Sequence, residues 1–450
     1  MPVHETGRDA CSPTHCITLL SVIPNTSIKN HSISIRQSIY LDNKCNPKIL
    51  AIMKLYGKPF YILLFSWMLS AFGFATMLPF LTIFLTEKYA LSVADVGIFF
   101  LLTALLRSFF QIYSGEISDL IGRKNIMSYS QTLRALLLCI AVLCMKLELH
   151  YFYIISFLGL SYVCASMFQP VAQAALSDHL PLNDFIHGFS RIRVAGNFSW
   201  MLGPILAGYL VKISFESLFL ASGLFSLLGA ILIHRHYIDV VKLDNKKTRP
   251  AIFSVLGDNI FIVFCLISFF LCITISQMFS SLSVYLSTYK KLDSTLIGYI
   301  FAINGFTVFL FQIPVSRYIT SKLRPLYGMS IGSLLYMSGY LIAGYANSTL
   351  AYIGILFCIS FGEVFVMPLT QTSVAKLAPE KMIGRYMGFY AMTAVAGWSA
   401  GPYIGGKILE WFQYDFLTSW KVISLFAFSA AIGYFVLDTL LRLYKSKRDI

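Results

Sequence analysis

The sequence predicts an all-α integral membrane protein in which twelve transmembrane helices form two six-helix repeats. Three observations predict this fold: an apolar composition, twelve apolar runs of spanning length, and an internal repeat. Of the 450 residues, 57% are hydrophobic and 12% are charged, and the mean hydropathy is +0.71. Because a soluble domain carries about twice that charged fraction, the excess apolar surface must face lipid.

Spanning a bilayer takes about 20 apolar residues at a rise of about 1.5 Å each. Twelve runs are long enough, although the sixth is short, and the loops between them have no room for a soluble catalytic domain. The runs are Tyr61–Leu85, Val96–Ile117, Ile126–Met145, Tyr151–Leu176, Val194–Ile213, Leu218–Ile233, Ile260–Leu286, Leu296–Ile319, Leu326–Ala346, Leu350–Ala375, Gly384–Leu409 and Val422–Leu443.

Basic residues are distributed unevenly between alternate loops. One set of loops and ends holds nineteen Lys and Arg residues, among them Arg191 and Arg193, whereas the other holds seven. Basic loops stay in the cytoplasm, so both termini are expected there, in a protein of the plasma (inner) membrane. The net charge of +14 follows from this topology and forms no continuous patch for nucleic acid.

The chain is expected to divide into five segments. Residues 1–55 are polar and have no hydrophobic periodicity, as in a disordered cytoplasmic tail. Translation could alternatively start at Met53. A six-helix half over 56–234, a basic cytoplasmic linker over 235–255, a second half over 256–445 and a tail over 446–450 follow.

Residues in one half recur in the other at nearly constant spacing. Phe110-Gln111-Ile112 recurs as Phe311-Gln312-Ile313, 201 residues later. At a spacing of 198 residues, three more groups recur: Pro170, Gln173 and Pro181 as Pro368, Gln371 and Pro379; Gly203-Pro204 as Gly401-Pro402; and Gly208 as Gly406. Two halves in the same orientation are related by an axis along the membrane normal.

The loop after the second run combines glycines, an acid and a basic pair. Its residues are Gly115, Ser118, Asp119, Gly122, Arg123 and Lys124. In this pattern the chain resembles the major facilitator superfamily, with Ile117 and Leu120 in place of that family's usual leucine and first arginine. The resemblance implies a secondary transporter that exposes one midplane site alternately to each side.

The same resemblance assigns roles to the loop. In the family, the loop acid meets the N-terminal end of helix 11, where the helix dipole favours a carboxylate. Asp119, with Arg123 and Asp178 nearby, would then form a cytoplasmic latch that stabilises the outward-facing state. The family's helix-4 arginine, often assigned to proton coupling, is absent from the matching stretch Ile155–Gly159.

Small residues and prolines mark the fifth and eleventh runs. Small residues let helix backbones approach closely, and a proline removes a helix hydrogen bond. Close packing and a hinge role in alternating access are both open. The residues are Gly203, Pro204 and Gly208 in the fifth run and Gly388, Gly397, Gly401, Pro402, Gly405 and Gly406 in the eleventh, whose pattern is similar to that of the superfamily's antiporters.

Three charged residues lie well inside apolar runs. A central charge costs roughly 2.5–3.5 kcal/mol on insertion scales and usually faces a cavity. Glu363 is a candidate proton or cation site or a structural acid, and Arg107 could attract an anion, hold a carboxylate such as Glu363, or bond neighbouring carbonyls. Arg134 is expected to extend toward the cytoplasmic surface.

Neutral polar residues in the cavity-side runs could contact substrate or hydrogen-bond between helices. They are Gln169, Gln173, Gln277, Asn304 and Gln371. The nine cysteines form no CxxC pair and the histidines have no ligand spacing, so we expect no metal site and no cofactor.

The leading hypothesis is proton-coupled efflux of a small amphipathic molecule by a monomer in the lipid bilayer. It rests on similarity to bacterial drug-efflux-type members in the Arg107–Gln111–Gly115 spacing and the stretch from Gly362 to Gly388. Uptake of a nutrient or anionic metabolite, with Arg107 recognising the anion, is the alternative. A membrane enzyme, an ATP-driven pump and a channel are disfavoured: the sequence has no catalytic cluster and no phosphate loop, and the two-half repeat argues against a channel.

Overall fold

The computed structural model describes residues 47–180, 185–239, 252–379, 382–413 and 415–446. The chain forms two compact units, Met1–Leu55 and Tyr56–Ile450. What is described of the first unit is helical, and everything below concerns the second. Most of the predicted tail 1–55, most of the predicted linker 235–255 and the last four residues lie outside the described residues.

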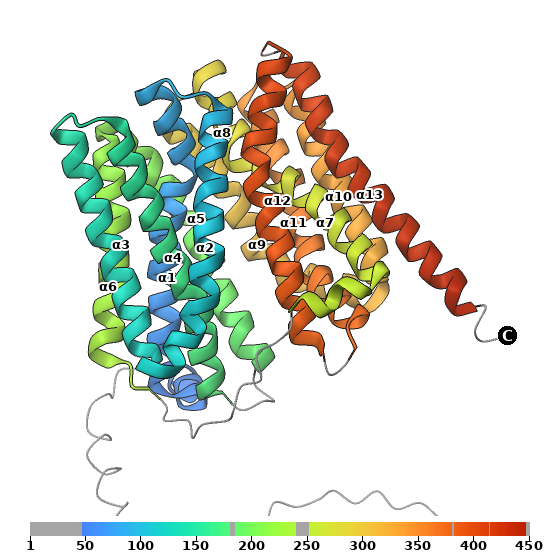
Figure 1. Cartoon of the computed structure of the whole chain (residues 1–450), viewed down its shortest axis with the longest axis horizontal. Coiled ribbons are helices and arrows are strands. Elements are labelled where there is room, and N and C mark those ends of the chain that lie inside the picture. The colour runs from blue at the N-terminus through green and yellow to red at the C-terminus, as the bar shows by residue number, and fades with distance from the viewer. Residues whose placement is uncertain (1–46, 181–184, 240–251, 380–381, 414, 447–450) are drawn as a thin grey trace, which may run out of the picture. The chain divides into compact units, whose positions relative to one another are not determined.

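Helices make up almost all of the described chain (Figure 1). The first six, which Figure 1 colours from blue to yellow-green, are α1 (Pro47–Tyr89), α2 (Val93–Ile121), α3 (Arg123–Lys146), α4 (Tyr151–His179), α5 (Phe185–Ile213) and α6 (Phe215–His236). The others are η2 (Ile252–Gly257), α7 (Asn259–Ser276), η3 (Gln277–Phe279), α8 (Ser281–Val284), η4 (Tyr285–Tyr289), α9 (Ser294–Lys322), α10 (Pro325–Ala343), α11 (Thr349–Leu377), α12 (Ile383–Trp411) and α13 (Phe416–Ser446).

The predicted all-α membrane fold is confirmed. Among the described residues, eleven segments are long and apolar enough to cross a membrane, with α7 to η4 counted as one. The twelfth is α12, which is 29 residues long but contains six glycines and three tyrosines, which lower its apolar character. Several of these glycines pack against neighbouring helices, so the part of α12 that carries them does not need an apolar surface.

Polar caps set where several helices begin. Ser92 accepts a hydrogen bond from the backbone N–H of Asp95, and the Asp95 carboxylate accepts one from the N–H of Ser92, which closes a capping box at α2. Asp258 and Asp293 cap α7 and α9 in the same sense, each accepting from a backbone N–H two or three residues later. These caps fix the loop boundaries to within a residue or two.

The fifth helix begins earlier than its apolar run. The sequence predicts a span from Val194, with Arg191 and Arg193 in the preceding loop, but α5 starts at Phe185 and contains both arginines. The predicted run agrees with the membrane-capable segment Arg191–Ile213, but the placement of Arg191 and Arg193 in a loop was wrong, because the helix continues beyond its apolar segment.

The seventh span is interrupted, which its apolar run does not predict. After Ser276 the helix tightens into the 3₁₀ turn η3, restarts as the single-turn α8 and widens into the π-turn η4. The Gln277 amide donates hydrogen bonds to the carbonyls of Ile273 and of Gly401 on α12, and the Ser281 hydroxyl donates to Gln277 Oε1. Side-chain bonds of this kind compete with the regular helix ladder.

The sequence repeat reappears as a pair of equivalent helix crossings between the halves. On one side α5 packs along α9, where Gly208 and Pro204 meet Ser294 and Gly298. On the other, α12 packs along α2, where Gly406 and Pro402 meet Ala94 and Gly97. Gly97 and Gly298 are themselves 201 residues apart. A β-carbon at Gly208 would lie 2.5 Å from the Ser294 carbonyl oxygen, so these backbones touch.

Other glycines of the predicted set pack helices within each half. Gly203 on α5 faces Ala75 of α1, while Gly397, Gly401 and Gly405 on α12 face successive turns of α7 and η3. Pro204 and Pro402 lie inside continuous helices. Close packing therefore accounts for most of these positions, and a hinge role for them stays a prediction.

The two ends of the helix bundle differ. We call the end that carries the loops around 122, 323 and 378 the basic end, and the end with loops around 90, 214, 293 and 412 the opposite end. Both glycine crossings lie toward the opposite end, which they close. Toward the basic end, Gly115 on α2 and Gly388 on α12 have open space where a β-carbon would stand, and Leu120 is 85% exposed.

The crossing at Gly406 can be tested with a matched pair of alanine substitutions on α12. Both Gly406→Ala and Gly388→Ala gain helix propensity, about 1 kcal/mol. Only Gly406→Ala forces a β-carbon into the α2 backbone at Ala94, so we expect it to destabilise the fold by about 1–3 kcal/mol. Thermal unfolding in detergent measures both. Equal effects of the two substitutions would contradict the close crossing.

Candidate functional site

A cavity of about 590 Å³ lies between the two halves. Its size is that of pockets for small organic ligands. The first half contributes residues of α1, α2, α4 and α5, and the second contributes residues of α7, η3 and every helix from α9 to α13. Glu363 and Arg107, which the sequence singles out on different helices, both line it.

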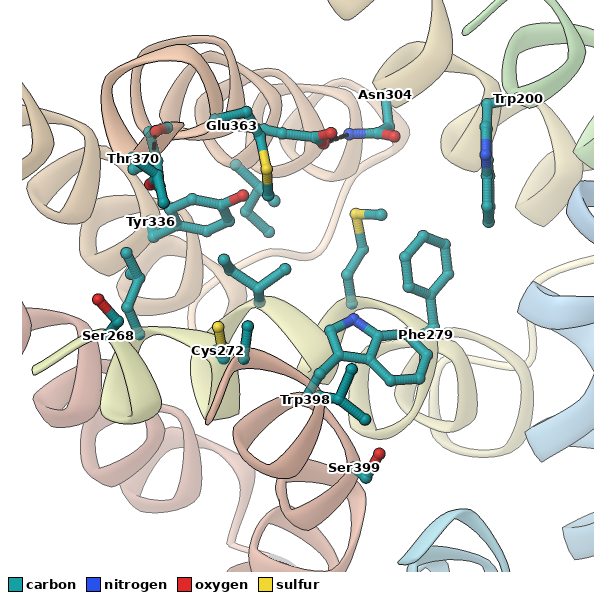
Figure 2. A pocket seen from close by; sticks show the side chains of 18 of the residues that line it. Trp200, Ser268, Cys272, Phe279, Asn304, Tyr336, Glu363, Thr370, Trp398 and Ser399 are labelled. Atoms are coloured by element: carbon teal, nitrogen blue, oxygen red, sulfur yellow. Dashed lines mark hydrogen bonds between the residues drawn. The ribbon is translucent and has the colours of Figure 1, made fainter. Parts of the chain in front are cut away.

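Aromatic side chains from both halves bound this cavity (Figure 2). Trp200 of α5 lies 5.3 Å from the Phe279 ring, and Phe279 lies 6.5 Å from Trp398 of α12, measured between ring centroids. We call these three side chains the aromatic bridge, because they connect the halves. Sequence reasoning missed them, although Trp200 and Trp398 are 198 residues apart and so belong to the repeat.

Glu363 stands in the middle of α11 and is partly exposed in the cavity wall. Its Oε2 accepts a hydrogen bond of 3.0 Å from the amide of Asn304 on α9 (Figure 2). The same amide donates to the Ser360 hydroxyl. A carboxyl group with one amide donor and an open face toward the cavity can exchange a proton with the cavity contents.

Arg193 is a positively charged residue of the first half that contacts the second half. It lies on α5 and donates a hydrogen bond of 2.8 Å to Gln312 on α9, so it links the two halves. Sequence reasoning placed Arg193 in a loop and missed this role. The recurrence of Gln111 at Gln312 marks the partner, but not the arginine that reaches it.

Arg107 and Arg134 are held by aromatic rings and not by acids. The guanidinium carbon of Arg107 lies 5.8 Å from the centre of the Tyr162 ring, and that of Arg134 lies 5.8 Å from the centre of Phe74. The prediction that Arg134 extends to the surface was wrong. Its side chain is 0% exposed and donates to the Ser222 hydroxyl on α6, because α3 packs tightly against α6.

The neutral polar residues fall into two groups. Asn304, Gln371 and Gln169 line the cavity. Gln277 is buried beside it and bonded to α12, and Gln173 is exposed on α4 outside the lining. Both were predicted from helix and residue type alone, which do not define the direction of a side chain.

The predicted loop residues meet in one ionic network of the first half. Arg123 at the start of α3 bridges two acids, pairing through Nη2 with Asp119 at 3.1 Å and through Nε with Asp178 on α4. Its Nη1 also donates to the Ser118 hydroxyl. In this conformation the predicted latch residues thus tie α2, α3 and α4 together.

Asp239, which sequence reasoning did not single out, completes the loop. Its carboxylate accepts a hydrogen bond of 3.0 Å from the backbone N–H of Lys124, at the N-terminus of α3. Gly122 has φ = 95°, and a β-carbon there would lie 2.5 Å from the same carboxylate. Glycine is therefore required at this turn for both its backbone angle and its lack of a side chain.

Polar contacts join the halves at the opposite end. The Lys212 ammonium at the end of α5 lies 3.0 Å from the carboxylate of Asp293, which caps α9. The Ser294 hydroxyl donates to the Gly208 carbonyl, and Thr82 of α1 donates to the carbonyl of Phe279 in η3. The cavity is accordingly closed at this end by side-chain and backbone contacts together.

A cavity midway between two repeated helical halves that pack together at the opposite end is the architecture of a multi-pass membrane transporter. The sequence model described as Major Facilitator Superfamily matches residues 63–402, and the chain belongs to that family. The resemblance in the loop after α2 is thereby confirmed.

Similar proteins include transporters of several kinds. The chain is 24% identical to YqjV of Bacillus subtilis, named as an uncharacterized MFS-type transporter, over 74% of this chain and 82% of that protein. It is 22% identical to a Na⁺, Li⁺, K⁺/H⁺ antiporter of Planococcus maritimus, over 80% of this chain and 91% of that protein. It is 24% identical to the multidrug resistance protein MdtH of Aeromonas hydrophila, over 75% and 84%.

Solved structures share the fold at low identity. The nucleoside transporter NupG has a TM-score of 0.72 at 13% identity, with 85% of this chain and 99% of that chain covered. A bacterial homologue of the lysosomal transporter Spinster has a TM-score of 0.67 at 14% identity, with 85% and 97% covered.

The Lys212–Asp293 pair predicts a pH dependence of closure at the opposite end. A hydrogen bond from the Thr295 hydroxyl, and then Lys212, lower the pKa of Asp293. The bond from Thr295 lies within α9, so only the contact with Lys212 depends on closure. Its contribution to closure is present above the ordinary Asp pKa of about 3.9 and disappears as pH falls through the lowered value. At neutral pH, Asp293→Asn should weaken closure by about 0.2–1 kcal/mol, as for an exposed pair.

Distances between spin labels on α5 and α9 measure this closure. Asp415→Asn is the matched control, since Asp415 accepts from the Thr418 hydroxyl at the start of α13 but lies within one half. It should leave the distances unchanged. If Asp293→Asn also leaves them unchanged at neutral pH, the pair does not hold this end closed.

Proposed function

We propose that this protein is a proton-coupled secondary transporter that exports small amphipathic molecules across the plasma membrane by alternating access. The observation that carries the proposal is Glu363, an acid in the wall of a cavity between two halves and under the electrostatic influence of Arg193 on the other half. The protein acts as a monomer in the bilayer, and its role is transport and not catalysis.

The basic end is proposed to face the cytoplasm, because positively charged loops remain on that side. Both termini are then cytoplasmic, and the described conformation, closed at the opposite end, is inward-facing. In this conformation the cavity receives cargo from the cytoplasm. Rocking of the halves about the midplane, with Pro204 and Pro402 as points of bending, would open the other side.

Proton binding at Glu363 changes the attraction between the halves. When ionised, the α11 carboxylate attracts Arg193 of α5, which favours the contact that Arg193 makes with Gln312 of α9. Protonation removes this attraction, so the equilibrium between the two conformations depends on pH. A ligand or proton shifts such an equilibrium only by its differential interaction with the two states. The attraction between Glu363 and Arg193 supplies such a difference.

The loop network is proposed to act in the opposite conformation. Asp119 pairs with Arg123 while the basic end is open. When that end closes, the N-terminal end of α12 comes within reach, and its dipole favours the Asp119 carboxylate. Asp178 holds Arg123 in place in both conformations, so the latch can form and release without a change in the backbone turn at Gly122 and Lys124.

Amphipathic cargo is supported by the cavity lining. Aromatic rings such as Trp200, Phe279 and Trp398 supply apolar surface, while Asn304 and Gln371 supply a few polar contacts. Relatives named as a multidrug resistance protein and as a cation/H⁺ antiporter favour export in exchange for protons.

Uptake of an organic anion together with protons is a second candidate. It is favoured by one observation, the guanidinium groups of Arg107 and of the buried Arg134 beside the cavity. An anion there would repel the ionised form of Glu363, so anion and proton would bind together, as in symport.

Glu363→Gln tests the coupling. In proteoliposomes, we expect extrusion of ethidium driven by a pH gradient to fall roughly tenfold or more, because the amide cannot take up a proton. Exchange of ethidium at equal pH on both sides should persist, since the cavity keeps its shape. Fluorescence of ethidium during a pH jump measures both rates.

Glu410→Gln is the control, because Glu410 pairs with Lys407 on α12 and does not line the cavity. It should extrude ethidium at the wild-type rate. Extrusion driven by a pH gradient that survives Glu363→Gln would exclude Glu363 as the coupling site. Accumulation in the direction of proton influx would favour symport over antiport.

A further inference from the structure

A second cavity of about 160 Å³ adjoins the first within the N-terminal half. Both cavities are lined by Phe74, Arg107, Gln169 and Trp200, so the smaller is a side pocket of the larger. Trp67 and Phe168 add apolar wall, and Arg134 of α3 also lines it.

Two guanidinium groups in this side pocket have unused hydrogen-bond donors. Arg107 Nε is buried without a partner, and so are Nε and Nη1 of Arg134, whose whole side chain is buried. Arg134 donates from Nη2 to the Ser222 hydroxyl. The five donors of a guanidinium form a planar fork that is suited to an oxyanion, and three donor nitrogens here have no protein acceptor.

No acid neutralises these arginines in the part of the chain that the structure describes. The acidic residues of α1 to α6 all lie within two turns of a helix end. Arg107 and Arg134 are instead central in α2 and α3. The ionisable group beside both is the Tyr162 hydroxyl, which is itself buried without a partner. The pocket therefore has a net positive charge inside an apolar wall.

We propose that this side pocket binds the acid group of the cargo, a carboxylate, sulfonate or phosphate monoester. Arg107 contacts the group from the cavity, and Arg134 supplies a second positive charge from behind. Glu363 lines the main cavity from the other half. The two charged walls together fit an amphoteric molecule with an apolar body, its acid on the arginines and its base near Glu363.

This inference rests on the proposed function, because it names the chemical class that the same cavity takes. It also agrees with exchange for protons, since a basic group near Glu363 competes with a proton there. A purely anionic cargo would bind together with the proton instead. The charge of the cargo thus decides between the two candidate functions.

Four biphenyl probes that differ only in charge test the proposal. They are 4′-(aminomethyl)biphenyl-4-carboxylate, its carboxamide, 4′-methylbiphenyl-4-carboxylate and its carboxamide. Calorimetric titration of the purified protein in neutral detergent should show each carboxylate binding roughly tenfold or more tightly than its carboxamide, as charge-assisted hydrogen bonds predict. This comparison uses the wild-type protein and needs no variant.

Substitutions then assign the preference to the arginines. Arg107→Gln and Arg134→Gln should each reduce the carboxylate preference to within roughly threefold. Arg107→Lys keeps the charge but loses the planar fork and its stacking on Tyr162, so it should retain only part of the preference. Arg324→Gln is the control, since Arg324 pairs with Asp438 away from the cavity. Each variant is compared by its melting temperature without ligand, so loss of folding is separated from loss of binding.

Two results would overturn the proposal: equal affinity for carboxylate and carboxamide in the wild type, or a preference that survives both arginine substitutions. Displacement of the carboxylates by phosphatidylglycerol in mixed micelles would assign the pocket to a lipid headgroup instead. Failure of the proposed function has a different signature, because the preference for aminomethyl over methyl probes reports on Glu363 and not on the arginines.

Discussion

Direct backbone contact between helices of opposite halves is the constraint on which the rest of this structure depends. Where α5 crosses α9 and α12 crosses α2, glycines leave no side chain between the helix backbones. The halves therefore meet at the opposite end within van der Waals distance. From there the helices diverge toward Gly115 and Gly388, and the volume between them becomes the cavity. The aromatic bridge forms part of the lining of this cavity.

Charge inside this frame is divided between the halves. The second half contributes Glu363 with its amide partner Asn304, and the first contributes Arg107, Arg134 and Arg193. Each central charge costs roughly 2.5–3.5 kcal/mol on insertion scales, which the cavity, cation–π contacts and hydrogen bonds offset in part. The two halves resemble each other in backbone but differ in charge, since these arginines lie in the first half and Glu363 lies in the second.

Periodicity and composition are sufficient to predict the helices, the repeat and the central positions of Glu363 and Arg107. These features follow from local apolar runs and from spacing along the chain. The role of Arg193, the interruption at Gln277 and the burial of Arg134 were not predictable in this way. Each depends on a partner distant in sequence: Gln312 for Arg193, Gly401 for Gln277 and Ser222 for Arg134. Trp200 and Trp398 could have been found from the repeat, because they are separated by its spacing of 198 residues.

The interrupted seventh span has a consequence for mutational tolerance. Where the helix narrows to η3, the Phe279 carbonyl is available to a partner outside its own helix, and the Thr82 hydroxyl of the other half donates to it. One side of this connection is therefore main chain, which every amino acid at position 279 supplies. Substitution at position 279 can reshape the cavity wall while this hydrogen bond persists, whereas replacing Thr82 with a residue that has no hydroxyl removes the donor. The cavity surface at position 279 can thus change without loss of this contact between the halves.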